Sequence, residues 1–309
     1  MINTNFALTN FDHAKFDEFL KKANISKTLP EKELLTNLGL TTENGYFKNA
    51  AILLFGKNIE RFLPQSMITC VLYKGKDKVF IIDRKDYKND IFSNYEEAMA
   101  FLYRHLRLRY EIKGFGPRKE ILELPKEALK EAVINAICHR DYGERGAVIQ
   151  IDIFDDRVEI SNPGGLIIKE SEFGKKSVSR NPLLFGFLQR IEFVEHVGSG
   201  ILRIQNAMQA AGLPAPKFEF GMFFTIIFMK PTVWGEEDTI KDTIRDTIIS
   251  DNELKILEEI KKNPQITAEE LSKIVHINLR NIKNNLKKLK DKKRIERKGS
   301  RKSGYWSIL

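Results

Sequence analysis

The chain has 309 residues, of which 42% are hydrophobic and 30% charged, and its net charge is +9. This composition is typical of a folded protein with two or three domains and excludes a disordered chain. No apolar run approaches the roughly 20 residues of a membrane span, and the first residues lack the pattern of a signal peptide. Cys70 and Cys138 lie in apolar stretches, so we expect reduced, buried thiols and a cytoplasmic protein.

Residues 1–117 predict an N-terminal α/β region. Apolar spacing indicates helices over residues 11–23, after Pro30 and over residues 95–107. Residues 66–73 are typical of a buried strand. The remaining predicted elements are a short helix or strand at 50–55 and a loop at 113–118, which closes the region.

Residues 125–140 predict a helix with a polar face. Glu131 and Asn135 are four residues apart and therefore lie on the same side of it. An asparagine oxygen can bind Mg²⁺ between phosphates, and a carboxylate can orient or deprotonate a water molecule. Arg140, at the helix end, is placed to pair with Asp141 or with a phosphate. By itself this spacing is also compatible with a surface helix that ends in a salt bridge.

Glycines follow the next predicted hairpin, which covers residues 148–161. The turn Asn162-Pro163-Gly164-Gly165 lets the backbone approach a flat ligand, although an ordinary type II turn explains it equally well. Residues 166–197 show little periodicity. Gly198-Ser199-Gly200 then opens a helix whose free N–H groups suit a phosphate, and a closing hairpin follows at 218–229.

In this order, these elements resemble the Bergerat-fold ATP-binding domain of the GHKL proteins, which include gyrase, MutL and histidine kinases. The likeness is strongest to RecG-related transcriptional regulators. It covers roughly residues 30–230, and its motifs are Glu131–Tyr142, Val158–Leu166, Ser179–Pro182 and Val197–Ile201. Such proteins often begin with a Schlafen-type AlbA domain, for which this chain is too short at its amino end. We therefore expect a natural short form or a fragment.

The resemblance implies ATP and Mg²⁺ as ligands, with Glu131 as the water-activating carboxylate and Asn135 as the metal ligand. It implies that nucleotide contacts come from Asn135, Asp141, Asn162, Gly164, Gly165, Arg180, Gly198, Ser199 and Gly200. The aspartate that binds the adenine amine in the wider superfamily is missing. Asn162 or Ser161 stands near its place, and an amide is a weaker acceptor than a carboxylate.

The last part of the chain is basic. Asn252–Leu309 contains 16 Lys and Arg against 7 Asp and Glu, so it carries the whole net excess. Three helical stretches and a basic hairpin predict a winged helix-turn-helix over 252–309, after a linker at 231–251 with a four-residue repeat. The residues expected to contact double-stranded DNA are Arg280, Asn281, Lys283, Asn284, Lys287, Lys298, Arg301 and Lys302. A winged helix used for protein contacts is the alternative.

Together these features predict an α+β protein with a Bergerat-type domain at 118–230 and the winged helix at its C-terminal end. The predicted function is an ATP-binding, DNA-binding transcriptional regulator that acts as a dimer or within a larger complex, with slow Mg-dependent ATP hydrolysis at most. Two alternatives stay open. One is a DNA-associated ATPase, for example of a defence system. The other is a protein-interaction scaffold with a degenerate nucleotide pocket.

Overall fold

The computed structural model describes residues 1–111, 119–194, 200–232, 251–275, 277–291, 294–299 and 304–308. The chain divides into two compact units, Met1–Thr232 and Val233–Leu309. Several predictions lie outside the described residues, namely the loop at 113–118, most of the linker, Gly198, Ser199, Arg301 and Lys302. No helix among the described residues combines the length and apolarity that crossing a membrane requires.

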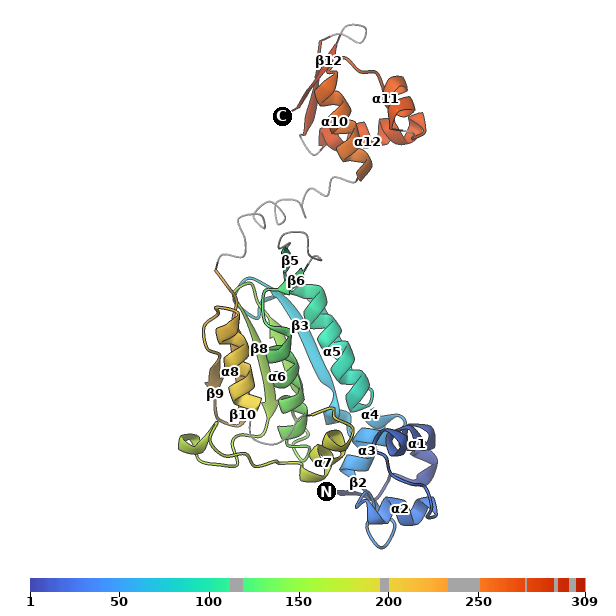
Figure 1. Ribbon diagram of the computed structural model, residues 1–309, viewed down its shortest axis with the longest axis vertical. Coiled ribbons are helices and arrows are strands. Elements are labelled where there is room, and N and C mark those ends of the chain that lie inside the picture. The colour runs from blue at the N-terminus through green and yellow to red at the C-terminus, as the bar shows by residue number, and fades with distance from the viewer. Residues whose placement is uncertain are drawn as a thin grey trace. The chain divides into compact units, whose positions relative to one another are not determined.

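A six-stranded mixed sheet forms the centre of the first unit (Figure 1). Its strands are, in spatial order, β4 (Phe80–Tyr87), β3 (Ile68–Lys74), β7 (Ile149–Ile153), β8 (Arg157–Pro163), β10 (Phe223–Met229) and β9 (Lys217–Glu219). β3 runs parallel to β7, with Cys70 opposite Ile151, and the other neighbours are antiparallel. Two strands of the 1–117 region thus belong to the same sheet as the strands that follow residue 118.

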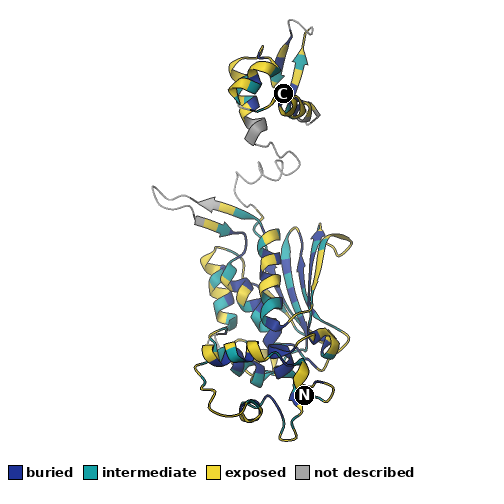
Figure 2. Cartoon of the chain, turned by 90° about the vertical axis from the view of Figure 1, so that its right-hand side faces the viewer, coloured by how far each residue is buried: buried dark blue, intermediate teal, exposed yellow. Residues whose placement is uncertain are grey.

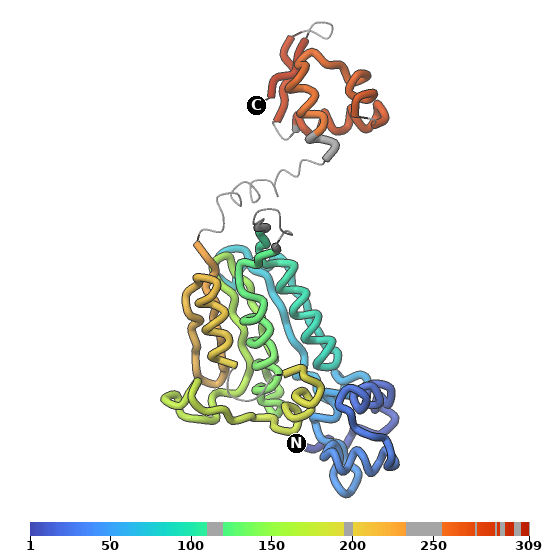
Figure 3. Tube along the Cα trace, in the orientation of Figure 1, coloured from blue at the N-terminus to red at the C-terminus, as the bar shows by residue number. Residues whose placement is uncertain are grey.

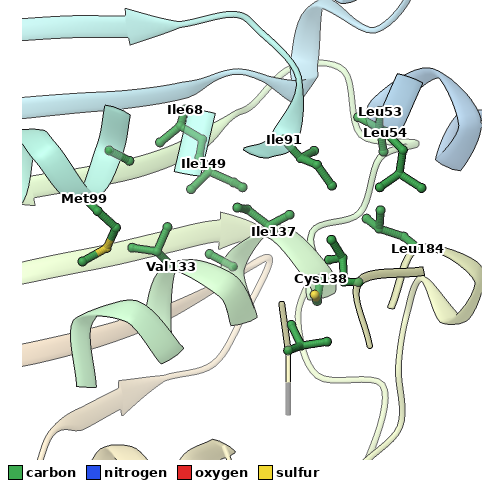
Figure 4. Close-up of a cluster of buried hydrophobic side chains, with 14 of the residues drawn as sticks. Leu53, Leu54, Ile68, Ile91, Met99, Val133, Ile137, Cys138, Ile149 and Leu184 are labelled. Carbon is green, nitrogen blue, oxygen red and sulfur yellow. The ribbon is translucent and has the colours of Figure 1, made fainter. Parts of the chain in front are cut away.

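Three helices cover one face of this sheet: α5 (Ile91–His105), α6 (Lys126–His139) and α8 (Gly200–Ala210) (Figure 1). The apolar stripe of α6 begins after Pro125 and is fully buried from Ala128 onwards. Figure 4 shows its Val133 and Ile137 facing Ile68 and Ile149 of the sheet. Burial of such side chains is the main source of stability in a fold of this kind.

Both cysteines lie in this core as free thiols, as expected. Burial raises the pKa of the Cys70 thiol and raises that of Cys138 to about 12, so both stay protonated near neutral pH.

A bundle of short helices packs at one end of the sheet (Figure 3). They are α1 (His13–Lys22), α2 (Glu31–Asn37), α3 (Asn49–Phe55) and α4 (Ile59–Phe62), with the short strands β1 (Ile2–Asn3) and β2 (Phe47–Lys48). The stretch 50–55, for which helix and strand were both open, is a helix. An aromatic cluster fills the bundle, and the Phe187 ring stacks on the Phe19 ring with their centroids 4.9 Å apart.

Phe187 belongs to α7 (Pro182–Arg190), a helix that falls within the segment 166–197, where the sequence shows little periodicity. The nine-residue helix buries Leu184, Phe187 and Leu188, which are too few positions to display a clear period. The remaining short elements of this unit are η1 (Leu8–Asn10), η2 (Pro64–Ser66), η3 (Glu170–Glu172) and the paired strands β5 (Leu108–Glu111) and β6 (Lys119–Leu122).

The described part of the second unit contains three helices and a two-stranded sheet: α10 (Asp251–Lys262), α11 (Ala268–Ile274), α12 (Leu279–Asp291), β11 (Ile295–Lys298) and β12 (Tyr305–Ile308). A capping box starts α11, where the Thr267 hydroxyl accepts from the Glu270 backbone N–H. Trp306 closes a separate apolar core, and its indole N–H donates to the Ile266 carbonyl at 3.2 Å. Figure 2 shows the buried residues of both units alternating with exposed ones along the helices. The predicted α+β class is confirmed.

Candidate nucleotide site and nucleic-acid surface

A cavity of about 140 Å³ lies in the first unit between α6, the turn after β8 and the start of α8. Residues 166–181, which we call the lid, line its remaining side. Six of the nucleotide-site residues expected from the sequence contribute to its wall: Glu131, Asn135, Gly164, Gly165, Arg180 and Gly200. Segments far apart in the chain thus meet around one hollow.

Glu131 and Asn135 line the cavity from the same face of α6. The first residue of α8, Gly200, packs directly against both. A Cβ atom at Gly200 would lie 2.4 Å from the Glu131 carboxylate and 3.2 Å from the Asn135 amide nitrogen, so a larger residue would displace Glu131. One turn further along α8, Arg203 donates to the Glu131 carboxylate at 2.7 Å. The positive end of α8 and an arginine therefore stand beside the carboxylate.

The donor set here suits a magnesium ion better than a structural metal. The described residues contain no group of three or more His, Cys, Asp or Glu side chains that could hold a metal. The Asn135 amide lines the cavity, and no hydrogen bond joins it to another described residue. Mg²⁺ typically takes one or two protein oxygens and completes its shell with phosphate oxygens and water. Because the Asn135 amide is available on the cavity wall, the residues present fit a Mg²⁺ ion bound together with phosphate.

The glycine turn is held in place by Asp141 and Arg180. The Arg180 guanidinium donates to the Gly165 carbonyl at 2.6 Å and to the Asp141 carboxylate at 3.5 Å. The Asp141 N–H donates to the Pro163 carbonyl at 2.8 Å. Gly164 has a φ of +108°, which L side chains rarely adopt, and its Cβ would lie 3.1 Å from that of Asp141. Packing within the chain thus requires this glycine.

Gly165 is constrained by a different neighbour. A Cβ atom there would lie 2.1 Å from the Gly221 carbonyl oxygen, in the turn between β9 and β10. We expect Gly165→Ala to lower the free energy of unfolding of the first unit by about 1–3 kcal/mol, because backbone must move to make room. Chemical denaturation of the full chain measures this change.

The matched control for that substitution is Gly186→Ala in α7, where a Cβ would meet nothing within 4 Å. Alanine favours a helix over glycine by about 1 kcal/mol, so this variant should be as stable as the wild type or more so. Equal stability of the two variants would show that the approach of Gly165 to Gly221 is not a tight one.

Two of the expected contact residues do not line the cavity. Asn162 is 1% exposed, and its amide donates to the Pro163 carbonyl at 3.3 Å. Asp141 lies behind Gly164 and contacts Arg180. Neither side chain therefore faces a ligand in the cavity directly. Gly198 and Ser199 lie outside the described residues.

Arg140 differs from its expected role of pairing with the Asp141 carboxylate or a phosphate. Its side chain is completely buried, and its guanidinium donates to the main-chain carbonyls of Asp141, Glu144 and Ala147. The guanidinium also lies over the Tyr142 ring, 5.1 Å from its centroid. Arg140 thus shapes the loop after α6 and is not available to a ligand.

Sequence reasoning missed several polar residues of the cavity wall, namely His139, Lys176, Ser177 and Arg203. His139 follows Asn135 by four residues and could have been found by extending the helical spacing. Burial, helped by the nearby Arg180 charge, lowers the pKa of His139, so its imidazole is neutral near pH 7. Arg203 becomes recognisable only once α8 is seen to pack on α6.

The lid is attached to the sheet through aromatic packing. The Phe173 ring lies 5.0 Å from that of Phe218, 4.9 Å from that of Phe220 and 5.7 Å from that of Phe224. Phe173 and Phe224 also line the cavity. The hollow therefore has an apolar wall on the lid side and a polar wall along α6, a combination that suits a base joined to phosphates.

In the second unit, α12 presents the expected polar surface. Its apolar residues Ile282, Leu286 and Leu289 are buried in the core. The opposite side carries the exposed residues Arg280, Asn281, Lys283, Asn284 and Lys287. On β11, Lys298 is exposed as well, whereas the Arg297 guanidinium lies 5.1 Å from the Trp306 ring centroid. A basic helix face of this kind suits the phosphates and base edges of a DNA groove.

Comparison with known families agrees with this division. Residues 146–228 match the model of the family described as "Putative ATP-dependent DNA helicase recG C-terminal". Residues 249–296 match the model described as "Winged helix-turn-helix DNA-binding". The first match contains Gly164, Gly165, Arg180 and Gly200, whereas α6 with Glu131 and Asn135 precedes it. The predicted resemblance to RecG-related proteins is confirmed.

Among solved structures, the DIP2311 protein from Corynebacterium diphtheriae is similar to the chain, with a TM-score of 0.60 at 19% sequence identity. The similarity covers 99% of this chain and 63% of that protein, so the chain spans less than two thirds of its length. A likeness at this identity concerns the fold. The comparison with curated proteins gave no match.

Proposed function

We propose that this chain, which joins a RecG C-terminal-like domain of the ATPase type to a winged helix-turn-helix, is an ATP-binding transcriptional regulator. In this proposal, the nucleotide bound by the first unit controls how the second unit binds DNA. The observation that carries it is the meeting of Glu131, Asn135 and Gly200 at one cavity, on a chain that also presents the basic face of α12.

The phosphates would bind at the Glu131 end of the cavity. There the first turn of α8 supplies N–H groups at its positive end, and Arg203 supplies a guanidinium. Asn135 would hold the Mg²⁺, which neutralises phosphate charge when bound. The apolar lid side, with Phe173 and Phe224, would receive the base.

Control of DNA binding requires that ATP bind two states of the protein with different affinity. The lid is the element best suited to differ between those states. Phe173 connects it to Phe218, Phe220 and Phe224 on and between β9 and β10, and β10 is the last strand before the chain continues to the second unit. Movement of the lid would therefore change the packing against β10, the strand that leads to the winged helix.

A DNA-associated ATPase is the second candidate, and Glu131 favours it. Its carboxylate lines the cavity and is held by Arg203 at 2.7 Å, so it is oriented for contact with an attacking water. In the regulator, slow hydrolysis by the same carboxylate would end the ATP-bound state. In the ATPase, repeated hydrolysis of ATP would itself be the activity of the protein.

Fluorescence anisotropy with a labelled DNA duplex tests the proposal in full-length wild type and Glu131→Gln. We expect DNA affinity to change about 5- to 100-fold between the nucleotide-free and Mg-ATP states, the range usual for coupled sites. The Glu131→Gln variant should keep this change and hydrolyse ATP more slowly still. Nucleotide binding without any change in DNA affinity would overturn the regulator, and DNA-stimulated hydrolysis lost in Glu131→Gln would favour the ATPase.

A further inference from the structure

Among the described residues, Glu131 is the only one whose carboxylate lines the cavity, and none has a carboxylate lining it at the place where the base would bind. Asn162, which stands near the position of the superfamily's missing aspartate, is buried beneath the turn with its amide on the Pro163 carbonyl. The Asp141 carboxylate accepts from the Gly143 N–H at 2.9 Å and is paired with Arg180. Neither residue lines the cavity, so another group must meet the polar edge of the base.

His139 lies where such a group is needed. It lines the cavity together with Gly164, Gly165 and Arg180. Along α6 it follows Glu131 and Asn135 at intervals of four residues, so the three side chains form one stripe of the cavity wall. Eight residues of helix separate Glu131 from His139, which corresponds to about 12 Å along the axis. One helix face thus reaches from the phosphate end of the cavity to its far end.

The backbone on either side of His139 is held by hydrogen bonds, and the His139 ring has no hydrogen-bond partner among the described residues. Asn181 donates to the carbonyls of Cys138 and Arg140 at 2.9 and 2.8 Å, which ties the lid to the end of α6 on either side of His139. No hydrogen bond joins the imidazole to any other described residue. A half-buried ring on a cavity wall with unused nitrogens is available to a ligand.

The protonation state of the ring decides what it can recognise. Burial and the neighbouring Arg180 charge lower the pKa of His139, so the ring is neutral at physiological pH. A neutral imidazole has one N–H donor and one acceptor nitrogen, and the two can exchange places. A carboxylate in the same position could only accept. Adenine presents an exocyclic amine, which requires an acceptor, whereas hypoxanthine and guanine present a carbonyl oxygen, which requires a donor.

We infer that His139 contacts the six-position of a bound purine. Its ring can accept a hydrogen bond from an amine there or donate one to a carbonyl oxygen. This inference rests on the proposed nucleotide site and names its ligand class, namely purine nucleoside triphosphates with relaxed choice of base. It differs from strict selection of adenine, which an acceptor-only carboxylate would give.

The test is calorimetric titration of Mg-ATP and Mg-ITP into the full chain, since ITP carries a carbonyl oxygen in place of the amine. For the wild type, the two dissociation constants should agree within about threefold. His139→Gln keeps a donor and an acceptor and should preserve this ratio. His139→Leu keeps neither and should weaken both nucleotides about tenfold, the effect of one lost hydrogen bond.

The decisive variant is His139→Glu, which has the reach of glutamine but can only accept when ionised. This variant should bind ATP with the affinity of the wild type, whereas its affinity for ITP should fall by about tenfold or more. A wild type that prefers ATP more than about 100-fold, with the preference unchanged in His139→Leu, would place base recognition elsewhere and overturn the inference. Binding of neither nucleotide to a folded wild type would instead overturn the proposed function, and the inference with it.

Discussion

Replacing Asn135 with alanine is expected to weaken the binding of Mg-ATP by about 100-fold, the upper effect of a single polar contact to a charged group. Asn135 supplies the amide oxygen proposed to bind Mg²⁺, and its amide has no hydrogen bond to another described residue. The described residues offer no acidic cluster that could take over the metal. Calorimetric titration of Mg-ATP into the full chain, with and without a chelator, measures the loss.

Lys130→Ala provides the control, because Lys130 is an exposed residue of the same helix that does not line the cavity. Its affinity for Mg-ATP should equal that of the wild type. Both variants should also melt at the wild-type temperature, since neither side chain is part of the core. If Asn135→Ala bound Mg-ATP within about twofold of the wild type, the metal would have to be held elsewhere.

The polar stripe of α6 could be predicted because a helix fixes the relation between its own residues locally. Glu131 and Asn135 share a face wherever that helix lies, so their joint presence in the cavity wall required only the helical period. The capping box at Thr267 and the buried side of α12 are of the same kind. Each depends on residues within one or two turns of each other.

The rest of the cavity depends on contacts between distant segments, which spacing does not reveal. The Arg203–Glu131 ion pair joins residues separated by 72 positions. Gly165 must be a glycine because Gly221 approaches it from another hairpin, and not only because of its own turn. For the same reason, the sequence suggested Asn162 for the base, whereas burial removes its side chain from the cavity wall and leaves His139 there.

In the N-terminal region, the sequence pattern does not reveal the strand β4. β4 joins the edge of the sheet beside β3, yet four consecutive apolar residues before and within it, Val79 to Ile82, are more than half exposed, followed by a charged run. The apolar run is short and ends inside the strand, and the charged residues that follow show no alternation, so this pattern does not identify a strand over Phe80–Tyr87. Its pairing is decided by β3, with Thr69 opposite Asp86, and not by its own pattern.

Removing three charges from α12 is expected to weaken DNA binding by about 100-fold at moderate salt. In the triple variant Arg280→Ala, Lys283→Ala and Lys287→Ala, the lost side chains lie on one exposed side of the helix, away from its buried stripe. Each contact with a phosphate releases a counterion, so the slope of log affinity against log salt should fall by about 2 to 3. Anisotropy titrations over a salt series measure both quantities.

A variant of equal charge separates the helix surface from the net charge of the unit. Lys255→Ala, Lys261→Ala and Lys262→Ala remove three exposed lysines from α10, which we do not expect to enter a groove. If only the overall excess of positive charge attracted DNA, both triple variants would lose affinity equally. A loss confined to the α12 variant, with the smaller salt slope, would identify α12 as the surface that binds the phosphates. If both variants lost the same DNA affinity, the winged helix would have no defined DNA-binding face. That result would favour the alternative of a winged helix used for protein contacts.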